Sequence, residues 1–317
     1  MSSARVTLAS TDPVLDTFAD DVGDSGPIAI EGGRSRWNFG GTLDASARII
    51  SAPVGIVEHI PEEMIVTVRC ATTTAELGAA LAAKGQRTGL PERGGTVGGS
   101  IVVGHNHLEV AGRGTLRSSV LQVRYVSAEG RIVTGGGPTV KNVTGFDLPR
   151  LMAGSLGALG CLAEVIIRTN PIPAVSQWFS ATGADPLSVS RSVLAPSAVV
   201  WDGAMTRVLL EGHAADVAVQ ATALRAAGSF EECEPFVEPV GHRWSLTPSD
   251  VLDLDGPTIG SHDTGAFHAL VGVGLVWAEN PQPLRQLPAA LQAVHDRVKA
   301  QFDPTGRLNP GRSPETS

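Results

Sequence analysis

The stretch from Val140 to Arg168 constrains the fold more than any other part of the chain, because it places many glycines beside an expected buried strand. It begins in a glycine-dense loop, residues 135–145, and a short helix is expected from Leu148. Apolar residues at 165–167 then predict a buried strand. Between these elements lie Gly154, Gly157 and Gly160. Ordering glycine costs more chain entropy than ordering any other residue, so we expect main chain here that turns with positive φ or packs against a large, flat object.

Composition sets the size and broad class of the protein. With 317 residues, of which 42% are hydrophobic, the chain is long enough for two packed cores. Its formal net charge of −8 argues against a nucleic-acid-binding surface. Cys70, Cys161 and Cys233 are far apart and form no C-x-x-C motif, so we expect no metal site and no iron–sulfur cluster held by this chain alone.

The sequence also predicts the compartment. No apolar run reaches the roughly 18 residues that a membrane-spanning helix needs, and the N-terminus has no apolar signal-peptide core. Scattered thiols are typical of a reducing environment. We therefore expect a cytoplasmic protein, whose membrane association, if it has any, is peripheral and made through partners.

A first glycine loop lies in residues 1–60, which are expected to form a small α/β unit with a helix that starts at Asp12-Pro13. A short apolar strand, residues 27–30, leads into Gly32, Gly33, Arg34, Ser35 and Arg36. A strand followed by two glycines and small polar residues can build a nest of main-chain N–H groups for an anion. An ordinary turn rich in Gly and Ser has the same pattern, so both interpretations stay open.

A second glycine loop follows a strand at 64–71 and a helix opened by the capping box of Thr73 and Glu76. It contains Pro91 and residues 93–100, whose sequence is RGGTVGGS. We interpret these residues as another loop that exposes main chain, although a plain surface loop is the alternative. Two such loops within 70 residues make the plain-loop alternative less convincing.

The sequence pattern changes at a domain boundary. A hairpin is expected before it, at 121–126 and 132–133, and the run from Asn170 to Pro173 marks the boundary itself. Beyond it the sequence predicts an antiparallel sheet with one or two helices; the expected elements are strands at 198–201, 207–210 and 269–277 and a helix at 214–227. A final helix, residues 287–302, should place one apolar face on the core, followed by a turn-rich tail.

Several chemical motifs are absent, and one polar cluster stands out. The chain has no G-x-G-x-x-G between a strand and a helix, no Walker-A loop and no G-x-S-x-G motif. His105 and His107 would share one face if they lay on a strand, where they could bind a metal or act as an acid–base pair; a solvated loop is the alternative. Four arginines lie in or beside the glycine loops and could neutralise a diphosphate or a carboxylate, or form a solvated rim: Arg34, Arg36, Arg93 and Arg113.

Five motifs in this order resemble one protein family. They are the Gly-Gly pair at 32–33, G-G-x-x-G-G at 94–99, K-N-x-x-G-x-D at 141–147, G-S-x-G-x-L-G at 154–160 and D-P-x-G-x-x-N-P-G at 303–311. Together they resemble the vanillyl-alcohol-oxidase-type flavoproteins, which carry a p-cresol-methylhydroxylase-type (PCMH-type) FAD-binding domain. Within this family the chain is most similar to the FAD-binding (E-type) subunit of bacterial glycolate oxidase.

The resemblance implies an α+β fold with three parts. Residues 1–171 would form the PCMH-type FAD-binding domain, with subdomains 1–60 and 61–171. Residues 172–286 would form a reduced antiparallel cap, and residues 287–317 a helix and tail that return to the FAD domain. Carried over by position, the residues that would contact FAD are Gly32, Gly33, Arg34, Ser35, Arg36, Pro91, Gly95, Thr96, Val97, Gly98, Gly99, Lys141, Asn142, Thr144, Gly145, Gly157, Gly160, Leu162, Val165 and Asn309.

The implied function is oxidation of a small 2-hydroxy acid by hydride transfer to FAD. His105 or His107 would be the base, and Arg113 or Lys141 would balance the substrate carboxylate. Relatives that attach FAD covalently use a His or Cys in the glycine loops, and residues 32–41 and 91–100 contain neither, so FAD should be bound non-covalently. Residues 175–285 also lack the H-x-x-H-x-H metal motif of related subunits. The alternative is therefore a non-catalytic FAD-bearing subunit that assembles with a second flavin subunit and an iron–sulfur subunit.

Overall fold

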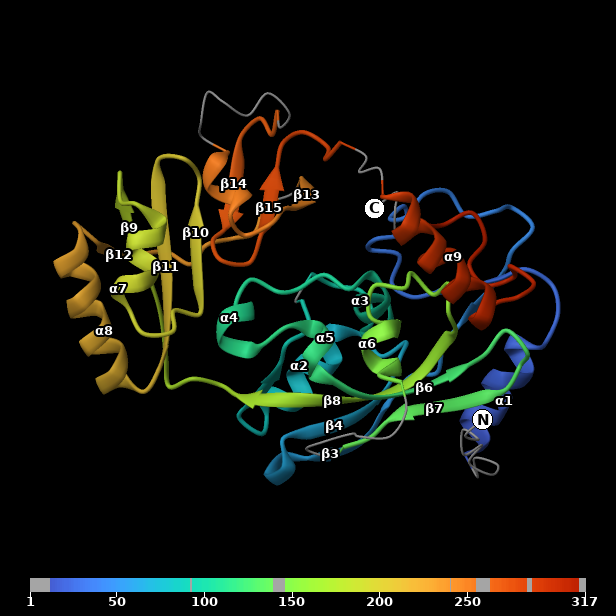
Figure 1. The fold of residues 1–317 in the computed structure, drawn as a ribbon. Coiled ribbons are helices and arrows are strands. Elements are labelled where there is room, and N and C mark those ends of the chain that lie inside the picture. The colour runs from blue at the N-terminus through green and yellow to red at the C-terminus, as the bar shows by residue number, and fades with distance from the viewer. Residues whose placement is uncertain are drawn as a thin grey trace. The chain divides into compact units, whose positions relative to one another are not determined.

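The computed structural model describes residues 12–91, 93–138, 146–239, 241–254, 263–283 and 287–313. The chain forms two compact units (Figure 1). The first contains Met1–His107, Thr115–Pro171 and Arg285–Ser317, and the second contains Leu108–Gly114 and Ile172–Leu284. Among the described residues, no helix combines the length and the apolar character needed to cross a membrane.

The first unit opens with a helix and a small parallel sheet. Helix α1 (Pro13–Val22) begins where the sequence predicts, because the Asp12 side chain accepts a hydrogen bond from the Val14 N–H at 3.1 Å and Pro13 occupies the first turn. Strand β1 (Ile28–Glu31) pairs in parallel with β2 (Arg48–Ser51). The first glycine loop is therefore held between two paired strands.

The main sheet of the first unit is built around β8 (Cys161–Pro171). Its strand order is β3 (Ile56–Ile60), β4 (Ile65–Arg69), β8, β6 (Val120–Val126) and β7 (Ile132–Gly136), and β5 (Gln86–Thr88) also pairs with β8. Figure 1 shows α3 (Val97–Val103), α5 (Leu116–Ser119) and α6 (Leu148–Met152) over the same side of this sheet. The sheet contributes fully buried aliphatic residues to the core: Val66, Val68, Val123, Val165 and Ile167.

The second glycine loop is in part a helix, which corrects the sequence interpretation. Residues from Val97 onward form α3, and the Thr96 side chain caps it by accepting from the Gly99 N–H at 3.2 Å. The amides of Val97 and Gly98 donate to the carbonyls of Thr72 and Cys70 at 2.9 and 2.8 Å. These main-chain donors are thus used within the fold.

The helix before this loop formed as predicted: α2 (Thr74–Ala82) has the expected capping box. A short 3₁₀ helix, η1 (Pro61–Glu63), lies between β3 and β4.

The second unit is a seven-stranded antiparallel sheet. Its order is β12 (Glu231–Cys233), β9 (Val175–Thr182), β11 (Met205–Gly212), β10 (Ala198–Trp201), β14 (Phe267–Leu270), β15 (Leu275–Ala278) and β13 (His242–Ser245). Helices α7 (Pro186–Ser192) and α8 (Ala214–Ala227) pack on the face that carries Val199 and Trp201. Helix α4 (Val110–Arg113) packs on the other face, beside Val200, and η2 (Asp250–Asp253) precedes β14.

One strand expected in this unit is in fact two. The run at 269–277 contains β14 and β15, which pair with each other across a tight turn. Gly272 and Gly274 have φ of 78° and 84°, a conformation that favours glycine. The sequence pattern indicated a single strand because both strands are apolar and buried and the turn between them is short.

The C-terminal segment returns to the first unit. Helix α9 (Ala289–Phe302) packs through Val298 and Phe302, whereas Leu291 and Val294 are 43% and 41% exposed, so only part of the expected apolar face is covered. After α9, the Arg307 guanidinium donates to the carbonyls of Val22, Gly23, Ser25, Gly26 and Ala128. These bonds fasten the tail to the start of the chain.

Candidate functional site

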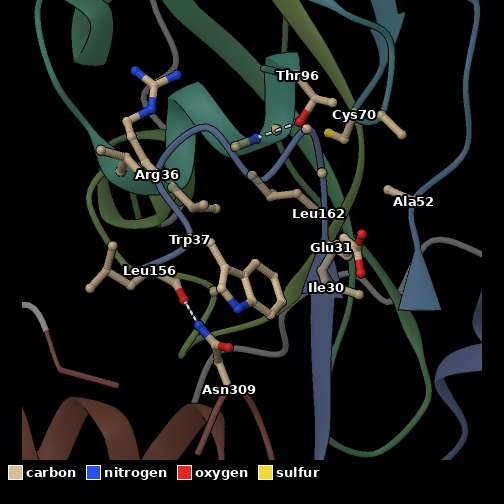
Figure 2. Close-up of a pocket in the computed structure, with 18 of the residues that line it drawn as sticks. Ile30, Glu31, Arg36, Trp37, Ala52, Cys70, Thr96, Leu156, Leu162 and Asn309 are labelled. Atoms are coloured by element: carbon tan, nitrogen blue, oxygen red, sulfur yellow. Dashed lines mark hydrogen bonds between the residues drawn. The ribbon is translucent and has the colours of Figure 1, made fainter. Parts of the chain in front are cut away.

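A pocket with about 900 Å³ of open space lies in the first unit (Figure 2). Its lining comes from β1 with the first glycine loop, α3, residues 156–162, Asn309 with Arg312, and also Ala52 and residues 70–71. Figure 2 shows the Trp37 ring between Leu156 and Ile30, with Asn309 beside it.

The main chain of the first glycine loop offers hydrogen-bond donors to this pocket. Within the described residues, no amide from Gly32 to Arg36 donates to a protein acceptor. Arg34 has φ of 51°, the left-handed conformation that lets successive N–H groups turn toward one side. The amides of α3 are used internally, so the first loop is the part of the lining suited to hold an anion through main chain.

The glycines of the two loops allow the loops to touch. A Cβ on Gly32 would be 2.4 Å from the Thr96 hydroxyl oxygen, and a Cβ on Gly98 would be 2.7 Å from the Cβ of Cys70. Both distances are below any real Cβ contact, so these positions require glycine for packing between chain segments. The glycines therefore shape the pocket wall and do not merely clear space for a ligand.

The charges of the lining are unevenly paired. Arg34 makes a bidentate ion pair with Glu31, both bonds being 2.7 Å. Arg36 donates to the Gly94 carbonyl at 3.2 Å and the Ser100 hydroxyl at 3.3 Å, and its Nη1 is buried without a partner among the described residues. Burial lowers the pKa of Arg36, and burial together with the Arg36 charge lowers the pKa of Arg93. Arg36 nevertheless stays a cation, because arginine does not lose its proton in proteins.

Residues from the chain terminus complete the wall. Asn309 has φ of 49°. Its side-chain nitrogen Nδ2 donates to the Leu156 carbonyl, and its Oδ1 is buried without a partner in the described part of the chain. Arg312 lies with its Cζ 4.2 Å from the centre of the Trp37 ring and donates to the Trp37 carbonyl at 2.6 Å. Its Nε is likewise buried and unbonded to any described residue. Buried polar atoms without partners are rare in folded proteins, so three around one pocket indicate a polar ligand.

Two cysteines also line the pocket. Cys70 and Cys161 are each 2% exposed. Burial raises the pKa of the Cys70 thiol far above its usual range and raises the pKa of Cys161 to about 12. The thiolate is the nucleophilic form of cysteine, so neither side chain is suited to attach a ligand covalently at neutral pH.

The pocket brings together most of the sequence-predicted cofactor residues. It is lined by Gly32, Gly33, Arg34, Ser35, Arg36, Thr96, Gly98, Gly99, Gly157, Gly160, Leu162 and Asn309. Pro91 and Val97 are buried outside the lining, Val165 lies in the core, and Gly95 is outside the lining and packs against Ser35. Lys141, Asn142, Thr144 and Gly145 lie outside the described residues.

The candidate catalytic residues are divided between the two units: His105 and His107 lie in the first and Arg113 in the second. His105 and His107 lie in a loop, which is the second of the two alternatives that the sequence left open for their backbone. The His105 ring is 4.7 Å from that of Phe39, a pocket residue, whereas His107 is 3% exposed and lies behind Gly89. Arg113 lies in the second unit, where it pairs with Glu109 at 3.2 Å. No group of three or more His, Cys, Asp or Glu suited to a metal occurs in the described residues.

Sequence reasoning missed Trp37, Arg312 and the two pocket cysteines. Arg312 had a usable signal, because it directly follows the Asn-Pro-Gly run of the C-terminal motif. The position of Trp37 immediately after the first loop was a weaker signal. Cys70 and Cys161 gave none, since a lone cysteine among apolar residues is usually a core residue.

Comparison with known proteins finds a family that matches part of the pocket-bearing unit. Residues 3–136 match the profile of a family described as FAD binding domain. Glycolate oxidase subunit GlcE of Escherichia coli (strain K12) is 28% identical to this chain, and the match covers 94% of the chain and 96% of that subunit. D-lactate dehydrogenase of Archaeoglobus fulgidus is 40% identical over 76 residues, which are 24% of this chain and 17% of that enzyme.

A solved structure shares the fold. Alkyldihydroxyacetonephosphate synthase superposes with a TM-score of 0.66 at 13% sequence identity, over 93% of this chain and 73% of that one. The predicted α+β fold, with a PCMH-type FAD-binding domain and a second antiparallel sheet, is confirmed. Residues 3–136 therefore match a family of FAD-binding domains, the fold is that of a PCMH-type flavoprotein, and FAD is the cofactor.

Proposed function

We propose that this chain is an FAD-dependent oxidoreductase subunit of the glycolate oxidase type, which oxidises a small 2-hydroxy acid. The observation that carries the proposal is the first glycine loop, whose amides from Gly32 to Arg36 donate to no described protein acceptor and line the pocket. The similarity to GlcE along nearly the whole chain supports the same function.

The pocket residues fit FAD by their donor chemistry. The loop amides, together with the buried Arg36 guanidinium, suit a diphosphate, which is an anion with many acceptor oxygens. Apolar residues such as Ile28, Ala52 and Leu162 suit a flat ring system. The raised pKa values of Cys70 and Cys161 support a cofactor held without a covalent bond.

The reaction needs an electron acceptor, a base and a cation. FAD, when bound, supplies the acceptor for the hydride that leaves C2 of the hydroxy acid. A base takes the hydroxyl proton, which leaves a 2-oxo acid, and His105 is the candidate closer to the pocket wall because its ring packs on Phe39. His107 is the second candidate. We propose that Arg113 or Lys141 balances the charge of the substrate carboxylate. Arg113 forms an ion pair with Glu109 in this structure.

The second candidate function is that of a non-catalytic FAD-bearing subunit. It is favoured by the lack of an H-x-x-H-x-H motif in residues 175–285, a motif found in the cap of related catalytic subunits. In this role the chain would assemble with a second flavin subunit and an iron–sulfur subunit and would pass electrons or stabilise the complex.

Anaerobic spectroscopy tests both candidates. The purified chain should be yellow with bound flavin, and glycolate or D-lactate should bleach it if the chain is catalytic alone. Flavin that stays oxidised with every 2-hydroxy acid, but is reduced once a D-type partner subunit is added, would support the second candidate. A protein that takes up no FAD on reconstitution would contradict both.

A further inference from the structure

The lining of the pocket carries two positive charges that no carboxylate balances. Among the described lining residues, the charged ones are Glu31, Arg34, Arg36 and Arg312. Glu31 is engaged by Arg34 in the bidentate pair, which leaves that pair neutral. Neither Arg36 nor Arg312 makes an ion pair with any described residue. A protein with a formal charge of −8 thus keeps two unbalanced cations in one pocket.

Arg312 is held in place by its neighbours. Its guanidinium lies over the Trp37 ring, with the Cζ 4.2 Å from the ring centre, and its Nη2 donates to the Trp37 carbonyl. The stack and the hydrogen bond fix the plane of the guanidinium, because they act on its face and on one edge. The remaining Nε–H is buried without a described acceptor, so it is available to a ligand in the pocket.

The segment that carries Arg312 is attached to the first unit by main-chain bonds. The Asn309 amide donates to the Ile28 carbonyl at 2.7 Å, and the Ser313 amide donates to the Gly40 carbonyl at 2.8 Å. The Asp44 amide in turn donates to the Pro310 carbonyl at 3.0 Å. Residues 309–313 therefore form part of the pocket wall because these bonds hold them against β1 and against the loop that contains Gly40 and Asp44.

We propose that Arg312 binds the diphosphate of FAD and that, with Arg36, it supplies the two positive charges which match the two negative charges of that group. FAD binding and docking of residues 309–313 are then coupled, because the ligand completes the hydrogen bonding of a side chain carried by the docked segment. This inference rests on the proposed function, since it assumes that the pocket holds FAD.

The first experiment compares FAD affinities of apo protein by fluorescence titration. R312M should bind FAD about 10- to 100-fold more weakly than wild type, as expected for loss of a charge-assisted hydrogen bond. R312K should recover most of that loss, because it restores the charge. R131M is the matched control: it makes the same change in net charge at an exposed pair with Glu129, and it should bind FAD as wild type does. The difference in FAD affinity between R312M and wild type should become smaller as the NaCl concentration rises, because salt screens the Arg312–diphosphate attraction that only wild type has.

The outcomes separate the inference from the proposed function. If wild type binds no FAD, the proposed function is wrong. If R312M binds FAD as tightly as R131M does, or if R312K is as weak as R312M, FAD can still be the cofactor but Arg312 is not a ligand of its diphosphate.

A second measurement uses the wild-type protein, so it does not depend on how a variant folds. Hydrogen exchange at residues 309–313 should slow when FAD is added. ADP, which carries the diphosphate without the flavin ring, should have the same effect. Exchange in this segment that is unchanged by both ligands would overturn the proposed coupling.

Discussion

The main chains of Gly33 and Gly95 lie in direct contact, so that a Cβ added to Gly33 would be 2.9 Å from the Gly95 Cα. The two residues belong to the two glycine loops and are joined by no regular secondary structure. Gly95 also has φ of 86°, and a Cβ there would be 2.5 Å from the Ser35 hydroxyl oxygen. Contact between the loops thus depends on two positions that both lack a side chain.

Replacing Gly33 with alanine should separate the loops and weaken FAD binding. The new Cβ meets main-chain atoms, which cannot move aside as a flexible side chain can, so the first loop must shift. We expect at least a tenfold loss of FAD affinity, measured by titration of the apo protein. The control is G78A in the exposed part of α2, where a Cβ would meet nothing within 4 Å. Since alanine favours a helix by about 0.5–1 kcal/mol over glycine, G78A should keep FAD affinity and slightly raise stability.

Neutralising Glu164 should destabilise the first unit strongly. Its side chain is 4% exposed, forms an ion pair with Arg69 at 2.9 Å and accepts a hydrogen bond from Arg124 at 3.1 Å. Removing one partner of a buried ion pair leaves charge without compensation and costs about 3–5 kcal/mol. Urea unfolding of E164Q should show this loss. The exposed pair of Glu129 and Arg131 provides the comparison, because E129Q should change the free energy of unfolding by less than about 1 kcal/mol. Equal effects of the two variants would argue that the buried network is solvated.

Stability should fall on acidification, and Asp12 should contribute to the fall. A hydrogen bond from Arg69 at 2.5 Å, with the charge of Arg69 and the amide of Val14, holds the pKa of the Asp12 carboxyl below its usual range. Because the folded pKa is lower than the unfolded one, this stabilisation is present above the unfolded pKa of about 3.9. It is lost as pH falls through the folded pKa.

The variant D12N isolates this contribution. Asparagine still caps α1 as well as aspartate does, so helix initiation is preserved while the titrating charge is removed. Thermal melts between about pH 7 and pH 3 should show a smaller decline for D12N than for wild type. The same decline in both proteins would assign the acid sensitivity to other carboxylates.

The pocket thiols should be unreactive, and the flavin should leave on denaturation. At pH 8, iodoacetamide should label Cys233 before Cys70 and Cys161, because Cys70 and Cys161 are buried and their thiol pKa values are raised. All three should react once the protein is unfolded. Acid precipitation of the holoprotein should leave the yellow flavin in the supernatant. A coloured pellet, or a flavin mass attached to a peptide that contains Cys70 or Cys161, would contradict non-covalent binding.

Local elements followed closely from the sequence. The Asp12-Pro13 pair, the capping box of Thr73 and Glu76, and the hairpin of β6 and β7 formed where the pattern predicted them. Each depends on residues within a few positions of one another, so the information is present in a short window. The start of α3 departs from this rule. Its glycines disfavour a helix, but Gly98 packs against Cys70, where a larger residue has no room.

The sequence by itself determined that glycine-rich loops serve a flat cofactor, because the spacing of five motifs matches one family. Only the tertiary structure decided which side chains face that cofactor. Arg34 and Arg36 are two residues apart, yet Glu31 neutralises the first and leaves the second unbalanced. Arg312 meets Trp37 across 275 positions of the chain. Contacts between such distant residues depend on how the strands and loops pack, and no short window of sequence contains that information.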